Sequence, residues 1–170
     1  IAAEGIVNYY QNDKNIIILE LNSETDFVAR DSNFIKLAES IANKLLENDE
    51  SEVINEISDE ISSIISKLGE NIKLRRFTKV NKNNYIYGYT HNNKIASIVE
   101  LKKENDSLAK DICMQIVASN PLALNEASID SSTILSEKEI YKKELENIDK
   151  KDDIKRNILE GKMKKFINDN

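Results

Sequence analysis

One aromatic residue, Phe27, lies in an otherwise polar segment, NSETDFVAR (22–30), that directly follows the strand-like run IIILELN. Thr25 and Asp26 are residue types that cap turns with their side-chain oxygens. The ring of Phe27 can pack against Phe34 as a hydrophobic staple at the start of the next helix, or it can stay exposed and contact a partner. The local pattern leaves both roles open.

Residues that carry catalysis, bind metals or hold nucleotides are scarce. The chain has one histidine, His91, and one cysteine, Cys113, which excludes an internal disulfide and zinc sites of the usual Cys/His kinds. We expect His91 in an exposed turn, since no nucleophile signature accompanies it, and Cys113 as a small buried apolar residue of a helix. None of the four glycines has the GxxxxGKS/T or GxGxxG spacing of a phosphate-binding loop. The sequence therefore predicts no enzyme and no cofactor, with the many carboxylates on solvated helix faces.

The overall charge and hydropathy exclude further classes of partner. The 30 acidic and 24 basic residues give a formal net charge of −6, so no overall positive field exists for a phosphate backbone. No apolar run approaches the roughly 20 residues that cross a bilayer, and the first residues lack the blocks of a secretory signal. We expect a soluble intracellular protein in a reducing compartment, with neither nucleic acid nor membrane as a direct partner.

Hydrophobic periodicity predicts the elements of the first part of the chain. Two apolar runs within 4–21, separated by the polar QNDK, predict a β-hairpin. Apolar residues recur every three or four positions in 34–45 and again in 53–68, which predicts two amphipathic helices. The polar pair at 31–32 can cap the first helix, and Gly69 can end the second in a left-handed conformation.

Strict alternation predicts strands in the next part. In NIKLRRFTKV one face carries Ile72, Leu74, Thr78 and Val80, and the opposite face carries Lys73, Arg75, Phe77 and Lys79. Together with YIYGYT and KIASIVEL, this segment predicts a three-stranded meander over 71–101. A third helix is expected over 108–117, ended by the SNP at 119–121. The charged segment 131–170 has two narrow apolar stripes, which predict an antiparallel helical hairpin.

Several blocks of the sequence occur together in one known family. The chain resembles elongation factor Ts of bacteria and organelles, the nucleotide exchange factor of elongation factor Tu. The resemblance rests on four blocks that follow one another in the family's order: LNSETDFVARDSNFIKLAESIA (21–42), LGENIKLRR (68–76), YTHNNKIASIVEL (89–101) and EGKMKKF (160–166). A further block, ICMQIVASNP (112–121), resembles the helix that the family has between the last two.

The resemblance implies an α+β fold of two small lobes of antiparallel sheet packed with helices, followed by a projecting antiparallel coiled-coil helical hairpin. We expect the first lobe over 1–70, with 71–80 able to join its sheet, the second lobe over 71–130 and the hairpin over 131–170. Family members carry a ubiquitin-associated-like module before this region and complete the second lobe after it. We therefore expect a core region without either end, and with an incomplete second lobe.

The resemblance also implies a partner and a site. The partner is elongation factor Tu in its GDP form, and the family's phenylalanine enters an apolar pocket of that GTPase and disturbs the magnesium and β-phosphate site. The partner-binding residues carried over to this sequence are Thr25, Asp26, Phe27, Val28, Leu68, Gly69, Glu70, Asn71 and His91. No catalytic, metal-binding or cofactor-binding residue is implied. For the pair at 75–76, a contact role and a solvated strand edge are equally open.

Two other functions stay open at this stage. The first is a non-catalytic interaction scaffold that acts through the C-terminal helical hairpin, which could also join two copies of the chain as a homodimer. The second is an enzyme that uses the scattered carboxylates, although no catalytic motif in the sequence supports it. We expect a bacterial cytoplasmic protein, with the mitochondrial matrix or the plastid stroma as the alternative.

Overall fold

The computed structural model describes residues 4–170, which form a mixture of helices and antiparallel strands. The chain divides into two compact units, Ile1–Val117 and Ala118–Asn170. The elements of the first are β1 (Glu4–Gln11), β2 (Asn15–Ser23), α1 (Asp26–Ala29), α2 (Ser32–Glu47), α3 (Glu50–Leu68), β3 (Lys73–Asn81), β4 (Tyr85–His91), β5 (Ile95–Leu101) and α4 (Asp106–Ser119), which runs into the second. The rest are the 3-10 turn η1 (Glu126–Ser128), α5 (Ser131–Glu146) and α6 (Asp152–Asp169).

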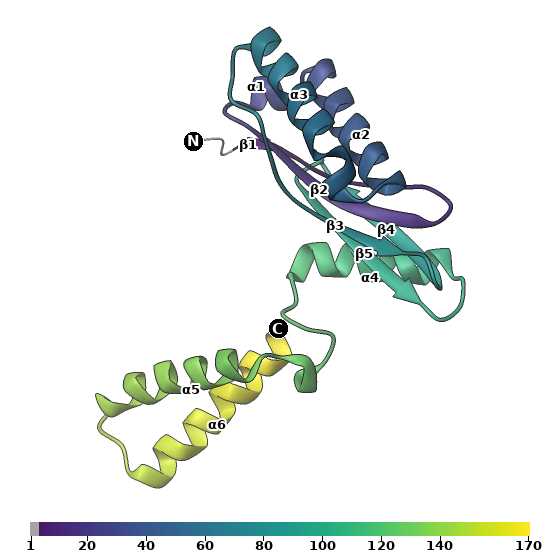
Figure 1. The fold of residues 1–170 in the computed structure, drawn as a ribbon. Coiled ribbons are helices and arrows are strands. Elements are labelled where there is room, and N and C mark those ends of the chain that lie inside the picture. The colour runs from purple at the N-terminus through teal and green to yellow at the C-terminus, as the bar shows by residue number, and fades with distance from the viewer. Residues whose placement is uncertain (1–3) are drawn as a thin grey trace. The chain divides into compact units, whose positions relative to one another are not determined.

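The first unit is built on an antiparallel sheet of order β1-β2-β3. Helices α2 and α3 cover one face of this sheet (Figure 1). The central strand β2 turns Ile17, Leu19 and Leu21 toward these helices, and all three are fully buried. The predicted hairpin of β1 and β2 is confirmed, with Tyr10 opposite Ile17 in its register.

Local capping sets the ends of both covering helices. Asp31 precedes α2 and accepts hydrogen bonds from the backbone amide of Asn33 at 2.7 Å and from its side chain at 2.9 Å. These bonds, the side-chain bond foremost, hold the pKa of Asp31 below its ordinary value, so the cap stays charged. Helix α3 ends at Gly69, whose φ of 75° is left-handed and whose amide donates to the Ile65 carbonyl at 2.8 Å. The two predicted amphipathic helices are therefore confirmed.

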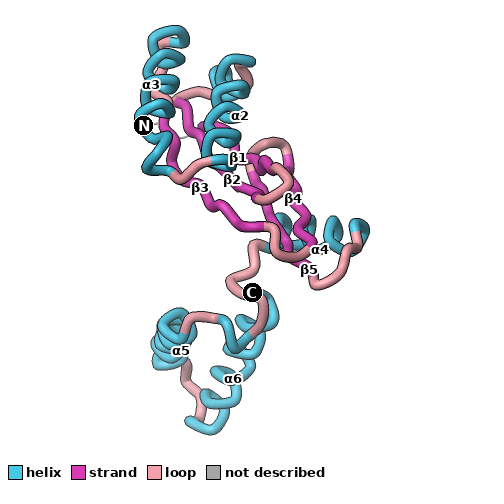
Figure 2. The backbone as a smooth tube through the Cα atoms, turned by 45° about the vertical axis from the view of Figure 1, so that its right-hand side comes forward, coloured by secondary structure: helices cyan, strands magenta, loops and turns pink. Residues whose placement is uncertain are grey.

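The predicted three-stranded meander over 71–101 is wrong. Strand β3 pairs with β2, whereas β4 pairs only with β5 in a separate two-stranded sheet among the described residues (Figure 2). The cause is the apolar face of β3, because Leu74 and Phe77 pack against the core cluster that β2 shares with the helices. Beyond β3, the backbone amide of Lys82 donates to the Lys14 carbonyl at 2.8 Å. This hydrogen bond joins the turn after β3 to the turn between β1 and β2.

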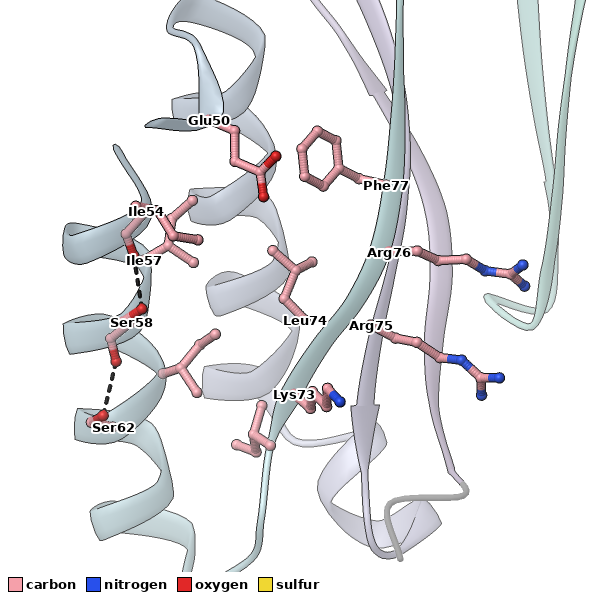
Figure 3. A pocket seen from close by; sticks show the side chains of 12 residues that line it. Glu50, Ile54, Ile57, Ser58, Ser62, Lys73, Leu74, Arg75, Arg76 and Phe77 are labelled. Atoms are coloured by element: carbon pink, nitrogen blue, oxygen red, sulfur yellow. Dashed lines mark hydrogen bonds between the residues drawn. The ribbon is translucent and has the colours of Figure 1, made fainter. Parts of the chain in front are cut away.

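The predicted alternation along β3 is also wrong, because the strand contains a bulge. Arg76 lies opposite Glu20 but Leu74 lies opposite Leu21, so Arg75 is an extra residue in the register. Leu74 and Phe77 consequently point to the same side, toward α3, and the two arginines point to the other side (Figure 3). Both arginines reach Glu20, at 3.6 Å from Arg75 and 2.6 Å from Arg76.

The sheet of β4 and β5 is tied to β1 by close contacts. Thr90 donates its hydroxyl to the side-chain oxygen of Asn8 at 2.6 Å, and Val7 donates its amide to the Asn93 carbonyl at 2.8 Å. Gly88 lies directly against the ring of Tyr9, where a β-carbon would come within 2.5 Å of a ring carbon. Only glycine allows this approach without movement of the ring.

Helix α4 packs on the β4–β5 sheet. The buried hydroxyl of Ser97 donates to the Cys113 carbonyl at 3.0 Å, and Cys113 itself is fully buried. Burial raises the pKa of the Cys113 thiol. The expectation that this cysteine is a small buried helix residue is confirmed.

In the second unit, α5 and α6 are consecutive helices in contact with each other. Figure 1 shows α6 running back toward the start of α5, and the Leu122 amide donates to the carbonyl of Asn170 at 2.9 Å. Leu145 and Ile129 are buried, but Leu135 and Ile140 on α5 are exposed. The coiled coil, its projection and the predicted division at residues 70 and 130 stay predictions.

Candidate partner-binding site

Helix α1 is a single turn of four residues, Asp26–Ala29, between β2 and α2. Thr25 caps it in an extended conformation, and its side-chain oxygen accepts from the Val28 amide at 3.4 Å. Val28 and Ala29 are buried in the core cluster. Phe27 points the other way and is 82% exposed. The turn is therefore anchored on its inner side and presents an isolated aromatic ring on its outer side.

The exposure of Phe27 excludes one of the two roles that the sequence left open, the hydrophobic staple. A hydrophobic staple requires the ring to pack against the helix that follows it. Phe34, its expected partner, is fully buried in the core, while Phe27 remains mostly in solvent. The staple is thus excluded, and a large apolar ring is available to a partner.

A carboxylate from a distant segment holds the start of α1. Glu70 accepts the Thr25 amide on Oε2 at 3.0 Å and the Thr25 hydroxyl on Oε1 at 2.6 Å. The Thr25 carbonyl in turn accepts the hydroxyl of Ser23 at 2.9 Å, and Ser23 is fully buried. The end of β2, the start of α1 and the loop before β3 are therefore connected through one threonine.

The predicted LGEN segment contributes in different ways along its length. Leu68 is partly buried against the core cluster, Gly69 forms the left-handed cap of α3, and Asn71 is exposed. Glu70 lies against Thr25 through the two hydrogen bonds described above. The structure thus brings Glu70 together with the α1 segment.

His91 ends β4 and is exposed. Its ring lies 3.2 Å from the hydroxyl of Tyr89 and 3.2 Å from the side-chain nitrogen of Asn92. The two asparagines that follow, Asn92 and Asn93, adopt positive φ angles of 51° and 55°, which asparagine tolerates better than most residues. The predicted exposed turn is present, and His91 stands at its first residue.

The turn that follows His91 lies beside α1. A cleft of about 320 Å³ is lined by residues of both segments and by their neighbours, namely Gly5, Ile6, Asp26, Ala29, Arg30, Ile35, Asn92, Asn93 and Lys94. His91 does not line it. Two segments that lie far apart in the sequence therefore form one continuous surface, to which α1 contributes Asp26 and Ala29.

Sequence reasoning missed several residues of this surface. Arg30 pairs with Asp26 at 2.9 Å, and Lys94 pairs with Glu4 at 2.7 Å. These exposed pairs contribute little to stability, but they place charges of both signs around the cleft. Ile35 is 40% exposed, and its position outside the apolar stripe of the predicted helix was a signal that could have identified it.

A second hollow lies between α3 and β3 and contains none of the predicted site residues (Figure 3). It has a volume of about 690 Å³. Leu74, Phe77 and Ile57 face into it, whereas Arg75 and Arg76 point away (Figure 3). The two arginines are engaged by Glu20 on the opposite side of the sheet.

Residues 4–170 contain neither a metal-binding cluster nor a membrane-spanning helix. No group of three or more His, Cys, Asp or Glu side chains in this part of the chain is arranged to hold a metal ion. Within the same residues, every helix is too short or too polar to cross a membrane.

Comparison with known proteins identifies the family. The family model described as "Elongation factor TS" matches residues 24–170. The chain is 41% identical over 187 residues to an elongation factor Ts of Clostridium acetobutylicum, in an alignment that covers 98% of this chain and 61% of the relative. It is 40% identical over 188 residues to that of Halothermothrix orenii, covering 99% and 63%. It is 33% identical over 181 residues to that of Legionella pneumophila, covering 99% and 62%.

The chain thus spans about three fifths of the length of these curated relatives. The family match nevertheless covers most of the chain, including Phe27, the LGEN segment and His91. By this match and by the identity to its relatives, the chain belongs to the elongation factor Ts family.

Proposed function

We propose that the chain acts as a guanine nucleotide exchange factor in translation elongation, with elongation factor Tu in its GDP form as partner. The single observation that supports this proposal best is the ring of Phe27, 82% exposed on a turn whose other side is anchored in the core. The TDFV block, Thr25–Val28, presses this ring onto the GTPase near its nucleotide and magnesium site. The relatives named above are bacterial, so we place this action in the bacterial cytoplasm.

The size of one aromatic contact limits what Phe27 can do alone. Full burial of a phenylalanine side chain contributes about 1.5–3 kcal/mol, and each 1.4 kcal/mol corresponds to about a tenfold change in an equilibrium constant. Coupling is reciprocal, so the factor by which the chain weakens GDP binding is also the factor by which GDP weakens binding of the chain. Rapid exchange therefore needs further contacts that hold the complex while the ring acts.

The surface around α1 can supply such contacts. The turn after His91 lies beside α1, and the cleft between them is lined by side chains of both charges. Charge pairs at the edge of an interface act mainly on orientation and on the rate of association. We assign His91 and Asn71 to this supporting contact and Phe27 to the displacement of the nucleotide. The reaction makes and breaks no covalent bond, so the chain acts as an exchange factor and not as an enzyme.

The test measures release of fluorescent GDP from the cognate elongation factor Tu by stopped flow. The complete gene product is expected to accelerate release, and Phe27→Ala is expected to lose about tenfold or more of that acceleration, the equivalent of one buried ring. Leu124→Ala is the matched control, because Leu124 is also an exposed apolar residue, at 94% exposure, but lies in the other unit. No acceleration by the unmodified protein would refute the proposal.

One observation favours a second function, that of an interaction scaffold that acts through the helical hairpin. A groove of about 680 Å³ lies between α5 and α6 and is lined in part by Ile134, Leu159, Met163 and Ile167. Such a groove could bind a partner or a second copy of the chain. Deletion of residues 131–170 separates the two functions, because a scaffold would lose its partner while the exchange factor keeps contact through α1. Sedimentation of the undeleted chain tests the homodimer.

A further inference from the structure

We infer that Glu70 is a positioning residue, which holds helix α1 in the orientation that presents Phe27 and does not itself contact the partner. The inference rests on the proposed function for its consequence, but its structural part can be tested without any partner. It changes the role of Glu70 from the contact residue that the family resemblance implied to a residue that acts through Thr25.

Both oxygens of the Glu70 carboxylate are used on one residue. Oε2 accepts the Thr25 amide at 3.0 Å, and Oε1 accepts the Thr25 hydroxyl at 2.6 Å. Hydrogen bonds to an ionised carboxylate are shorter and about twice as strong as those between neutral groups. The two bonds fix both the backbone and the side chain of the residue that begins α1. The orientation of the carboxylate is thus set by Thr25, the residue that it holds.

Thr25 is the residue on which the whole turn depends. Its hydroxyl oxygen accepts from the Val28 amide at 3.4 Å while it donates to Glu70, and its carbonyl accepts from the Ala29 amide at 3.2 Å. An isolated helix of four residues is not stable in water, because nucleation costs more than so few hydrogen bonds return. The stability of α1 must therefore come from outside, through buried Val28 and Ala29 on one side and through Glu70 at its start.

The position of Glu70 is itself fixed from both sides. It follows Gly69, the left-handed residue that ends α3, and it lies two residues before Ile72, which is buried in the core. The short segment between the end of α3 and buried Ile72 thus places the Glu70 carboxylate against Thr25, 45 positions earlier in the sequence. Its negative charge also lies at the start of α1, where the helix dipole favours an anion.

The consequence concerns how Phe27 meets its partner. With α1 fixed, the exposed ring is held in one direction before the complex forms, and its ordering adds little to the cost of association. Without Glu70 the turn opens more often, and the ring must be ordered again at each encounter. Loss of Glu70 therefore slows the release of GDP because α1 is less well ordered, although no contact with the GTPase is removed.

The first experiment needs only the protein itself. Amide hydrogen exchange is measured by NMR on the unmodified protein and on Glu70→Ala, with Glu47→Ala as the control, since Glu47 is an exposed carboxylate at the end of α2. We expect the amides of Val28 and Ala29 to exchange about tenfold faster in Glu70→Ala, the change that corresponds to one hydrogen bond to a charged group. Amides of the buried part of α2 should keep their rates. Unchanged rates in α1 would overturn the inference.

The conservative variant Glu70→Gln sharpens this experiment. Its amide group retains one oxygen that can accept a hydrogen bond but has a nitrogen that cannot. Exchange rates in α1 should lie between those of the unmodified protein and those of Glu70→Ala. A Gln variant as fast as the Ala variant would contradict the two-bond arrangement.

The second experiment joins Glu70 to nucleotide release through a double-mutant cycle. Glu70→Ala, Thr25→Val and the double variant are assayed for release of fluorescent GDP from elongation factor Tu. Thr25→Val removes the hydroxyl bond to Glu70 and keeps the amide bond. If Glu70 acts through Thr25, the double variant should therefore lose less activity than the sum of the two single losses. Additive losses, or a loss of release in Glu70→Ala without faster exchange in α1, would mean that Glu70 contacts the partner directly. Phe27→Ala separates the two proposals, since an unaffected release rate in that variant would refute the proposed function while the exchange rates still decide the role of Glu70.

Discussion

A matched pair of phenylalanine substitutions tests whether Phe27 is kept for contact and not for stability. Phe27 is 82% exposed and Phe34 is fully buried, although the two lie on consecutive helices, α1 and α2. Full burial of a phenylalanine side chain contributes about 1.5–3 kcal/mol. Because about a fifth of Phe27 is shielded from water, its removal should cost only about 0.3–0.5 kcal/mol of the free energy of unfolding.

Phe34→Ala should behave very differently. It removes a ring from the centre of the packed core and leaves a cavity, a change that typically costs about 3–5 kcal/mol. The free energy of unfolding should therefore fall at least fivefold more for Phe34→Ala than for Phe27→Ala. Such a loss can be comparable to half of the whole stability of a small domain.

The assay is urea denaturation followed by far-ultraviolet circular dichroism, because the chain has no tryptophan to report unfolding by fluorescence. The urea midpoint of Phe27→Ala should fall only slightly below that of the unmodified protein, by about 0.1–0.5 M, with the same dependence on urea. A loss of more than about 2 kcal/mol in Phe27→Ala would show that the ring is part of the core and would refute our account of α1. A small loss of stability combined with a large loss of GDP release would support it.

Two further predictions concern the sheets of the first unit. Gly88→Ala should lower the free energy of unfolding by about 1–3 kcal/mol, since the new methyl group would meet the ring of Tyr9. In a protein that already carries Tyr9→Ala, the same Gly88→Ala change should cost less. Urea denaturation of the two single variants and the double variant measures the difference. Burial raises the pKa of Tyr10 to about 12, so its neutral form stabilises the fold below the ordinary pKa near 10, and this contribution is lost as the pH rises from there through 12. Unfolding measured between pH 8 and 11.5 should show a smaller decline of stability in Tyr10→Phe than in the unmodified protein, and equal declines would contradict the assignment.

Much of the first unit could be predicted because its signals are local. The bounds of α2 and α3 follow from apolar residues three and four positions apart, and their ends follow from Asp31 and Gly69, which act within one turn. The same holds for the β1–β2 hairpin and for the burial of Cys113 on α4. The family was also recognisable, because its blocks are continuous stretches of sequence.

The choice of partner for β3 could not be predicted in this way. Alternation shows that a segment is extended but does not say which strand lies beside it, and the adjacent strand β4 was the default partner. Only the packing of Leu74 and Phe77 against the helices fixes β3 beside β2. The bulge at Arg75 then shifts the faces by one residue, which a strict period of two cannot anticipate.

The candidate site shows the same division. The sequence by itself determined that Thr25–Val28 is a capped turn with one apolar ring, because these properties depend on neighbours within a few positions. Only the tertiary structure decided that the ring faces solvent, that Glu70 holds the turn from 45 positions away, and that the turn after His91 lies beside α1. The physical reason is that side-chain exposure and contacts between distant segments depend on how whole elements pack, which no local pattern contains.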